Sequence, residues 1–171
     1  MLQKKICMLG AYAVGKTSLV RRCVDSLFSE RYHTTVGVKV DKKQLRVHGQ
    51  AVTLMLWDLE GEDDFHPLHF SHLRGASAYL LVADGTRAST LSKAASLQES
   101  AKGIVGPVPF VLALNKCDLK ADWRIEQNQI EAIKAKGFDV MFTSARTGEG
   151  VDEMFESLTH RVLAETCNEC H

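Results

Sequence analysis

Residues 10–17 have the sequence GAYAVGKT, which fits the pattern G-x-x-x-x-G-K-[ST]. An apolar run over residues 6–9 precedes this stretch, and apolar residues at helical spacing follow it over residues 19–27. Between a strand and a helix, such glycines let backbone N–H groups curl around phosphates, and the positive end of the helix dipole adds to the attraction. We therefore predict a loop that binds the phosphates of a nucleotide.

Two side chains of this loop have predicted roles. Lys16 would bridge the outer phosphates, and the hydroxyl of Thr17 would be a ligand of Mg²⁺. The alternative is a glycine turn that only joins a strand to a helix. Because the motif contacts no base, it fits an ATPase, a small kinase or a GTPase equally well.

The composition fits one globular domain. The chain has 171 residues, of which 45% are hydrophobic and 25% charged. Basic and acidic residues balance at 21 each, so no net charge would draw the chain to nucleic acid or to an anionic membrane. No apolar run approaches the roughly 20 residues that span a bilayer. The five cysteines lack disulfide-framework spacing, which predicts a reducing compartment and a cytoplasmic protein.

Short apolar runs alternate with helical periodicity along the chain. Strands are predicted over residues 6–9, 54–57, 79–83, 108–114 and 140–142, and helices over residues 19–27 and 151–162 and around 91–95 and 130–133. A run over residues 38–47 suits a hairpin with the strand that follows it, and its lysines suit a sheet edge. We predict an α/β fold of the P-loop NTPase class, with a mostly parallel six-stranded sheet, one antiparallel edge strand, and helices on both faces.

Two further stretches follow predicted strands at the same sheet edge. Residues 115–118 (NKCD) end in Asp118, whose carboxylate can accept from the N1–H and amine groups of guanine, a pair that adenine lacks. Residues 143–146 (TSAR) would present backbone N–H groups to the base from a second side. Taken alone, either stretch also fits an ordinary loop after a strand.

With these motifs in order, the chain resembles the Ras-like small GTPases, closest to the Rab type, over essentially its whole length. The resemblance is carried by residues 10–17, Thr35-Val36-Gly37, Trp57-Asp58 with Gly61, Asn115-Lys116 with Asp118, and Ser144-Ala145. Residues 71–76 (SHLRGA) also resemble the segment after the second switch of Rab proteins. The resemblance to the Ras-like family implies a GTPase domain over residues 1–166 and a short tail over residues 167–171. It also implies a regulatory switch that alternates between GTP and GDP with Mg²⁺.

The resemblance also implies a role for each matching residue. Phe28 would pack on the guanine and Tyr32 would close over the phosphates, although without the family they would be a core residue and a surface aromatic. Gly61 would donate its N–H to the γ-phosphate. The implied metal residues are Thr17, Thr35 and Asp58, and the implied catalytic residues are Lys16, Thr35 and Glu62. The implied nucleotide-binding residues are Tyr12, Ala13, Val14, Gly15, Lys16, Thr17, Ser18, Phe28, Tyr32, Thr35, Asp58, Gly61, Asn115, Lys116, Asp118, Ser144, Ala145 and Arg146.

The second switch departs from the family pattern W-D-T-A-G-Q. Glu62 replaces the glutamine that orients the attacking water, and Glu60 replaces a small residue. A carboxylate about 4 Å from a phosphate charge costs up to about 4 kcal/mol at an effective dielectric of about 20. We therefore predict weak intrinsic hydrolysis, at or below about 10⁻⁴ s⁻¹. The competing hypothesis is that Glu62 orients the water or accepts its proton.

Two side chains bear on activating proteins. Tyr12 is bulkier than the usual family residue and would fill the space through which an activating protein inserts an arginine. Arg31 invites comparison with GTPases that supply an arginine in cis, but a solvated loop arginine is the preferred interpretation.

Partners are predicted at residues 35–47 and 60–74, where effector, exchange-factor and activating proteins would bind a monomer. His66, His69 and His72 suit a helix facing a partner better than a zinc site. The ending CNECH matches a haem-attachment string, for which we prefer a reduced surface pair of cysteines. It has no prenylation box, so any recruitment to membranes would be indirect.

Two other functions share parts of this pattern. A scaffold locked in one nucleotide state would keep every binding motif and lose only turnover. A P-loop kinase for a small molecule would need an arginine-rich lid and an acceptor-binding insertion, and no segment of the sequence supplies either.

Overall fold

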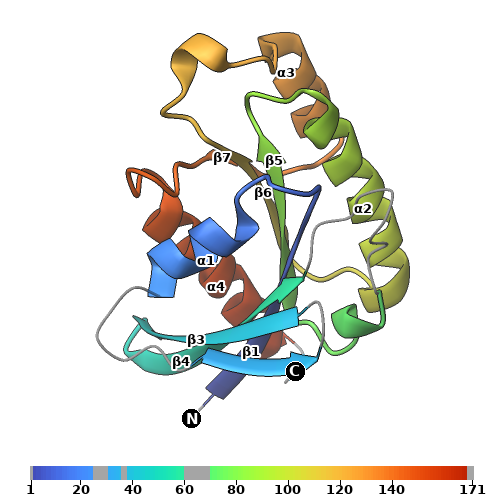
Figure 1. The fold of residues 1–171 in the computed structure, drawn as a ribbon. Helices are drawn as coiled ribbons and strands as arrows, with labels where there is room; N and C mark the ends of the chain where they lie inside the picture. The colour runs from blue at the N-terminus through green and yellow to red at the C-terminus, as the bar shows by residue number, and fades with distance from the viewer. Residues whose placement is uncertain (1, 25–30, 36–37, 60–69, 169–171) are drawn as a thin grey trace.

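The computed structural model describes residues 2–24, 31–35, 38–59 and 70–168, with the backbone alone described for residues 31–35 and 167–168 (Figure 1). One sheet has the strand order β2-β3-β4-β1-β5-β6-β7. Its strands are β1 (Leu2–Gly10), β2 (Arg31–Thr35), β3 (Val38–Val47), β4 (Gln50–Leu59), β5 (Ala78–Asp84), β6 (Phe110–Asn115) and β7 (Val140–Phe142). The helices in these ranges are α1 (Lys16–Val24), α2 (Ser89–Val105), α3 (Gln127–Ala135) and α4 (Val151–Asn168), with short 3-10 turns η1 (Phe70–Leu73) and η2 (Lys120–Asp122).

The sheet is parallel except at β3. Strand β1 pairs in parallel with β4 and β5, and the parallel pairing continues through β6 to β7. Strand β3 runs against both of its neighbours, β4 and β2. These directions confirm the predicted α/β fold class with one antiparallel strand.

The sheet has one strand more than the six predicted. Strand β2 has the sequence RYHTT, which lacks the alternating apolar pattern from which strands are predicted. It pairs with the side of β3 that faces away from β4, where Arg31 lies opposite Asp41 and Tyr32 opposite Val40, so the edge strand is β2 and not β3 as predicted. The lysines of β3 were predicted to lie at a sheet edge. One of them, Lys43, instead donates from its Nζ to the Cys23 carbonyl in α1 at 2.6 Å.

Helices cover both faces of the sheet, as Figure 1 shows with α1 and α4 on one side and α2 on the other. Alternate residues of each strand serve the two faces. Ile6 and Met8 of β1 pack with α1 and α4, whereas Cys7 and Leu9 pack with α2 and α3. Strand β5, next to the central strand β1, is buried along its whole length, as expected for a strand covered on both faces.

The carboxyl ends of the central strands meet at one edge of the sheet. In the pairing register, Gly10 at the end of β1 lies opposite Val82, and Asp84 at the end of β5 lies opposite Asn115 at the end of β6. Ligands of open α/β sheets bind beyond such strand ends. The loops that follow these strands therefore define where a site can form.

Replacing Gly10 tests the close approach of β1 to β5. A Cβ at Gly10 would lie 2.6 Å from the Val82 carbonyl oxygen, so Gly10→Ala should lower the free energy of unfolding by about 1–3 kcal/mol in urea denaturation. The control is Gly103→Ala in α2, where a Cβ would meet no atom within 4 Å. This control should raise stability by about 0.5–1 kcal/mol, because alanine has the higher helix propensity. A Gly10→Ala protein as stable as the control would contradict the described strand packing.

Candidate nucleotide site

The loop between β1 and α1 turns tightly at Gly15. This residue has a φ of 104°, and a Cβ there would lie 2.3 Å from Nδ2 of Asn115. Glycine tolerates that backbone conformation and leaves room for the close approach. The second glycine of the motif therefore lets the loop lie directly against the segment of residues 115–118.

Two carbonyl groups of the loop accept hydrogen bonds from that segment. Nδ2 of Asn115 donates to the Val14 carbonyl at 3.0 Å, and Nζ of Lys116 donates to the Ala13 carbonyl at 3.3 Å. In a trans peptide the next N–H points away from the carbonyl. The N–H groups of Val14 and Gly15 consequently face the inside of the loop, where an anion would bind.

Lys16 folds its side chain back into the loop. Its Nζ donates to the carbonyls of Gly10 at 3.2 Å and Ala11 at 3.1 Å, and the residue is only 6% exposed. Burial lowers the pKa of Lys16 to about 8, although the Asp58 carboxylate acts in the opposite direction. A buried ammonium group that bonds to neutral carbonyls has capacity for an anionic partner, which suits the predicted contact with phosphates.

Thr17 and Asp58 bring two oxygen ligands together. The Thr17 hydroxyl donates to Oδ2 of Asp58 at 2.5 Å, which joins the start of α1 to the end of β4. Burial raises the pKa of Asp58, and the Thr17 hydrogen bond and the Lys16 charge act against that rise. A bound cation would stabilise this buried carboxylate, and Mg²⁺ prefers such oxygen ligands. These two residues therefore fit the predicted metal site.

A pocket of about 420 Å³ opens beside the loop. Its lining includes seven residues from the predicted nucleotide-binding set: Gly15, Ser18, Asn115, Lys116, Asp118, Ala145 and Arg146. The remaining lining residue is Leu119, which is not among the residues predicted from the sequence motifs. The only sequence feature that could have predicted Leu119 is its position directly after the Asn-Lys-x-Asp stretch, where an apolar side chain can pack beside a base.

Hydrogen bonds join the two loops predicted to hold the base. Oδ1 of Asn115 accepts from the Thr143 hydroxyl at 3.2 Å and from the Ala145 N–H at 3.3 Å. The Ser144 hydroxyl donates to Oδ1 of Asp118 at 2.8 Å. The Asp118 carboxylate is thus held at the pocket, with Oδ2 free of that bond, in a position that suits the donor groups of guanine.

Asp84 belongs to the candidate site although no sequence motif predicted it. Its side chain is 1% exposed, and its Oδ2 lies 2.8 Å from Nζ of Lys116 and 3.1 Å from Nε of Arg87. Oδ1 accepts from the N–H and hydroxyl of Thr86 at 2.9 and 2.7 Å. Burial would raise the pKa of Asp84, but the hydrogen bonds from Lys116, Thr86 and Arg87 outweigh it and hold the pKa at about 2. The sequence feature that could have pointed to Asp84 is that it is an acidic residue at the end of an apolar strand.

Comparison with known proteins identifies the family. The sequence matches the Ras family model over residues 5–164. The chain belongs to the Ras family. It is 30% identical to Ras-related protein Rab-4 of Dictyostelium discoideum, covering 94% of this chain and 80% of that protein. It is 32% identical to Ras-related protein Rab-21 of the same organism (93% and 76%) and 30% identical to Ras-related protein Rab-13 of Rattus norvegicus (95% and 81%).

These findings confirm the predicted resemblance, and the protein is a Rab-type small GTPase. Proteins of the Ras family bind GTP and GDP, generally with Mg²⁺, and act as switches. Within the described parts of the chain, no helix combines the length and apolar character needed to cross a bilayer. Among the same described residues, no group of three or more His, Cys, Asp or Glu side chains is arranged to hold a metal ion.

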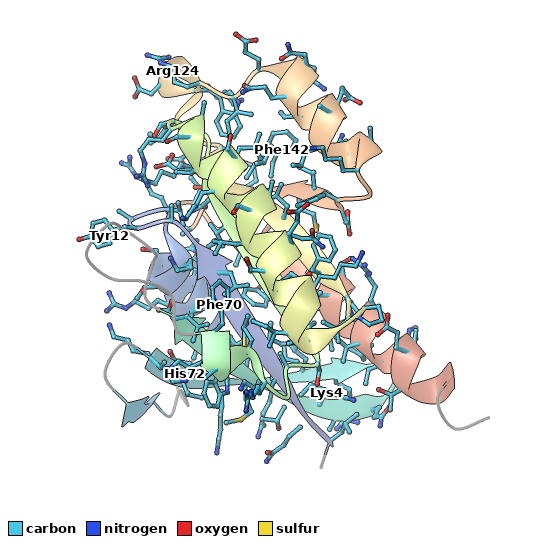
Figure 2. All side chains as sticks on the ribbon, turned by 90° about the vertical axis from the view of Figure 1, so that its right-hand side faces the viewer. Lys4, Tyr12, Phe70, His72, Arg124 and Phe142 are labelled. Carbon is cyan, nitrogen blue, oxygen red and sulfur yellow. The ribbon has the colours of Figure 1, made fainter. Side chains whose placement is uncertain are left out.

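The small GTPase brings most of its predicted site residues to one edge of the sheet. Residues 12–18 lie in or directly after the loop, and Asp58 is hydrogen-bonded to Thr17 at its end. Asn115, Lys116, Asp118, Ala145 and Arg146 line the pocket, and Ser144 is hydrogen-bonded to Asp118. The side chain of Tyr12 is the exception, because the residue is 65% exposed and its side chain projects from the molecule in Figure 2.

Other predicted residues of this GTPase cannot be placed in the site. Tyr32 and Thr35 lie on β2, where the backbone of Tyr32 pairs with Val40 and that of Thr35 with Val38. Phe28, Gly61 and Glu62 lie outside the described residues, as do Glu60, His66, His69 and the ending over residues 169–171. Their roles stay predictions.

The charge on Asp84 should stabilise the GTPase in a pH-dependent way. Because the folded pKa of Asp84 is about 2, below the ordinary aspartate value of 3.8, its contribution is present above about pH 4 and is lost as the pH falls toward 2. Asp84→Asn should cost about 1–2 kcal/mol at pH 7, a value reduced by the partial exposure of Lys116 and Arg87. Urea denaturation at several pH values measures this difference, with the exposed Asp122→Asn as the control. A difference from wild type that does not shrink below pH 4 would contradict the assignment.

Proposed function

We propose that this Rab-type GTPase holds guanine nucleotides in the pocket of residues 115–118 and 144–146, with their phosphates in the loop of residues 10–17. The observation that carries the proposal is the 2.8 Å hydrogen bond by which Ser144 fixes the Asp118 carboxylate. Guanine offers two donors to such a carboxylate and adenine offers none in that arrangement. The phosphate loop lies against the same pocket through Gly15.

Separate groups of residues would bind the phosphates and the metal ion. The N–H groups of the loop and the Lys16 ammonium would bind the phosphates, and Lys16 would also stabilise charge that develops on them during hydrolysis. Thr17 and Asp58 would hold Mg²⁺, together with Thr35. Bound Mg²⁺ would neutralise charge on the β- and γ-phosphates.

We further propose that hydrolysis is weak. Support comes from the sequence of the second switch, in which Glu62 stands where the family has the glutamine that orients water. A carboxylate beside the γ-phosphate is repelled, so it would turn away or become protonated. If Glu62 instead accepts a proton from the attacking water, hydrolysis would be faster than proposed.

The remaining proposals concern partners and location. Effector, exchange-factor and activating proteins would bind residues 35–47 and 60–74 of a monomer, and the domain would comprise residues 1–166. Cys7, Cys23 and Cys117 are free, which supports a cytoplasmic location for this part of the chain.

Asp118→Asn tests base recognition. The change removes the charge that would accept from guanine and should weaken GDP binding about 10- to 100-fold, the cost of a lost charged hydrogen bond. Competition of GDP, GTP and ATP against a fluorescent GDP analogue measures the affinities. The matched control is Asp122→Asn on the exposed η2 turn. Wild-type protein that binds ATP as tightly as GTP would contradict the proposal and favour a small-molecule kinase.

Glu62→Gln tests the proposed slow hydrolysis. Single-turnover hydrolysis of bound GTP should proceed at or below about 10⁻⁴ s⁻¹ in the wild type and faster in the variant, because a neutral amide can orient water without repelling phosphate. Nucleotide released from purified protein should be counted in parallel, since a locked scaffold would retain one nucleotide without turnover. A fast wild type that is slowed by glutamine would contradict the proposal.

A further inference from the structure

Arg87 connects the phosphate loop to a buried carboxylate. It lies just before α2, on a different segment from every predicted site residue. Its Nη2 donates to the Tyr12 carbonyl at 2.8 Å while its Nε donates to Oδ2 of Asp84 at 3.1 Å. One planar guanidinium therefore joins a backbone group of the loop to the end of β5.

The carboxylate that anchors Arg87 is itself fixed. Asp84 is 1% exposed, and Thr86 supplies two hydrogen bonds to its other oxygen. Arginine carries its donors in a rigid fork, so fixing one edge of the guanidinium also orients the other. The Arg87 guanidinium is thus already oriented toward the Tyr12 carbonyl, so it loses little side-chain entropy when it forms this hydrogen bond.

The Arg87 hydrogen bond is one of three that hold successive carbonyl groups of the loop. The carbonyl groups of residues 12, 13 and 14 accept hydrogen bonds, in that order, from Arg87, Lys116 and Asn115. These donors are neighbours, because Arg87 and Lys116 share Asp84 and Asn115 lies opposite Asp84 in the sheet. The three carbonyls therefore face one group of side chains, and the N–H groups that follow them face away from it.

Ala13 shows why the first of these three hydrogen bonds matters. Its φ is 59°, a left-handed conformation that is unfavourable for a residue with a Cβ. Rotating the peptide between Tyr12 and Ala13 could relieve that strain, but it would also turn the Ala13 N–H out of the loop. The Arg87 hydrogen bond to the Tyr12 carbonyl opposes this rotation, and the Lys116 bond to the Ala13 carbonyl holds the other side.

We propose that Arg87 is a positioning residue for nucleotide binding, which holds the Tyr12 carbonyl outward so that the Ala13 N–H faces the phosphates. The inference rests on the proposed function of the loop. Arg87 acts through the backbone and is not placed in contact with nucleotide. Its effect should therefore appear in the phosphate contacts and leave the choice of base unchanged.

Release of a fluorescent GDP analogue tests the inference. Arg87→Ala should release it about tenfold faster than wild type, because the loop loses a charge-assisted hydrogen bond that is partly exposed. Arg161→Ala is a matched control, since Arg161 also joins a carboxylate (Asp139, 3.3 Å) to a carbonyl (Phe110, 2.9 Å) and has the same 42% exposure, but lies away from the loop. Its release rate should stay within about twofold of wild type.

Arg87→Lys separates geometry from charge. A lysine keeps the charge but lacks the fork that spans both partners, so it should release the analogue nearly as fast as the alanine variant. The ³¹P resonance of the β-phosphate of bound GDP should shift in both Arg87 variants and stay in place in Arg161→Ala. The preference for GTP over ATP should not change in any of them.

The outcomes discriminate between the two proposals. Wild-type protein that binds the analogue, with Arg87→Ala unchanged in rate and in ³¹P resonance, would overturn the inference alone. Arg87→Lys behaving as wild type would also overturn it, because charge without the bridge would then suffice. Failure of wild-type protein to bind guanine nucleotide would overturn the proposed function together with this inference.

Discussion

The outward orientation of three successive carbonyl groups, at residues 12–14, is the constraint on which the site depends. An isolated loop has no reason to present several N–H groups to one point, because each peptide can rotate. Hydrogen bonds from neighbouring strand ends remove that freedom before any ligand arrives. The loop is thereby preorganised, and little of the binding energy of an anion is spent on ordering it.

The side chains that impose this order also join two parts of the site. Lys116 lies in the segment proposed to recognise the base, yet it contacts the loop of residues 10–17 and the buried Asp84. Asn115 bonds both to that loop and to the second base loop at Ala145. A change at the base can therefore reach the phosphate loop through direct contacts. This connection gives a physical reason why the base and phosphate motifs occur together at one sheet edge.

The sequence predicts the parts of the fold whose signals are local. The loop of residues 10–17 has a defined spacing, and the strands and helices around it have clear periodicity. Strand β2 was missed because its pairing depends on the edge of β3, which lies elsewhere in the chain. Asp84 and Arg87 were missed because their roles arise from contacts between separate segments. Sequence spacing cannot reveal a carboxylate shared by two cations.

The preorganised loop and the Asp118 pocket are together proposed to select guanine nucleotides. Amide NMR of ¹⁵N-labelled protein tests this selection most directly, after bound nucleotide has been removed. GDP should shift the N–H resonances of Ala13, Val14 and Gly15 strongly, and ADP at the same concentration should not. Resonances that stay in place with GDP, or that move equally with ADP, would contradict this selection.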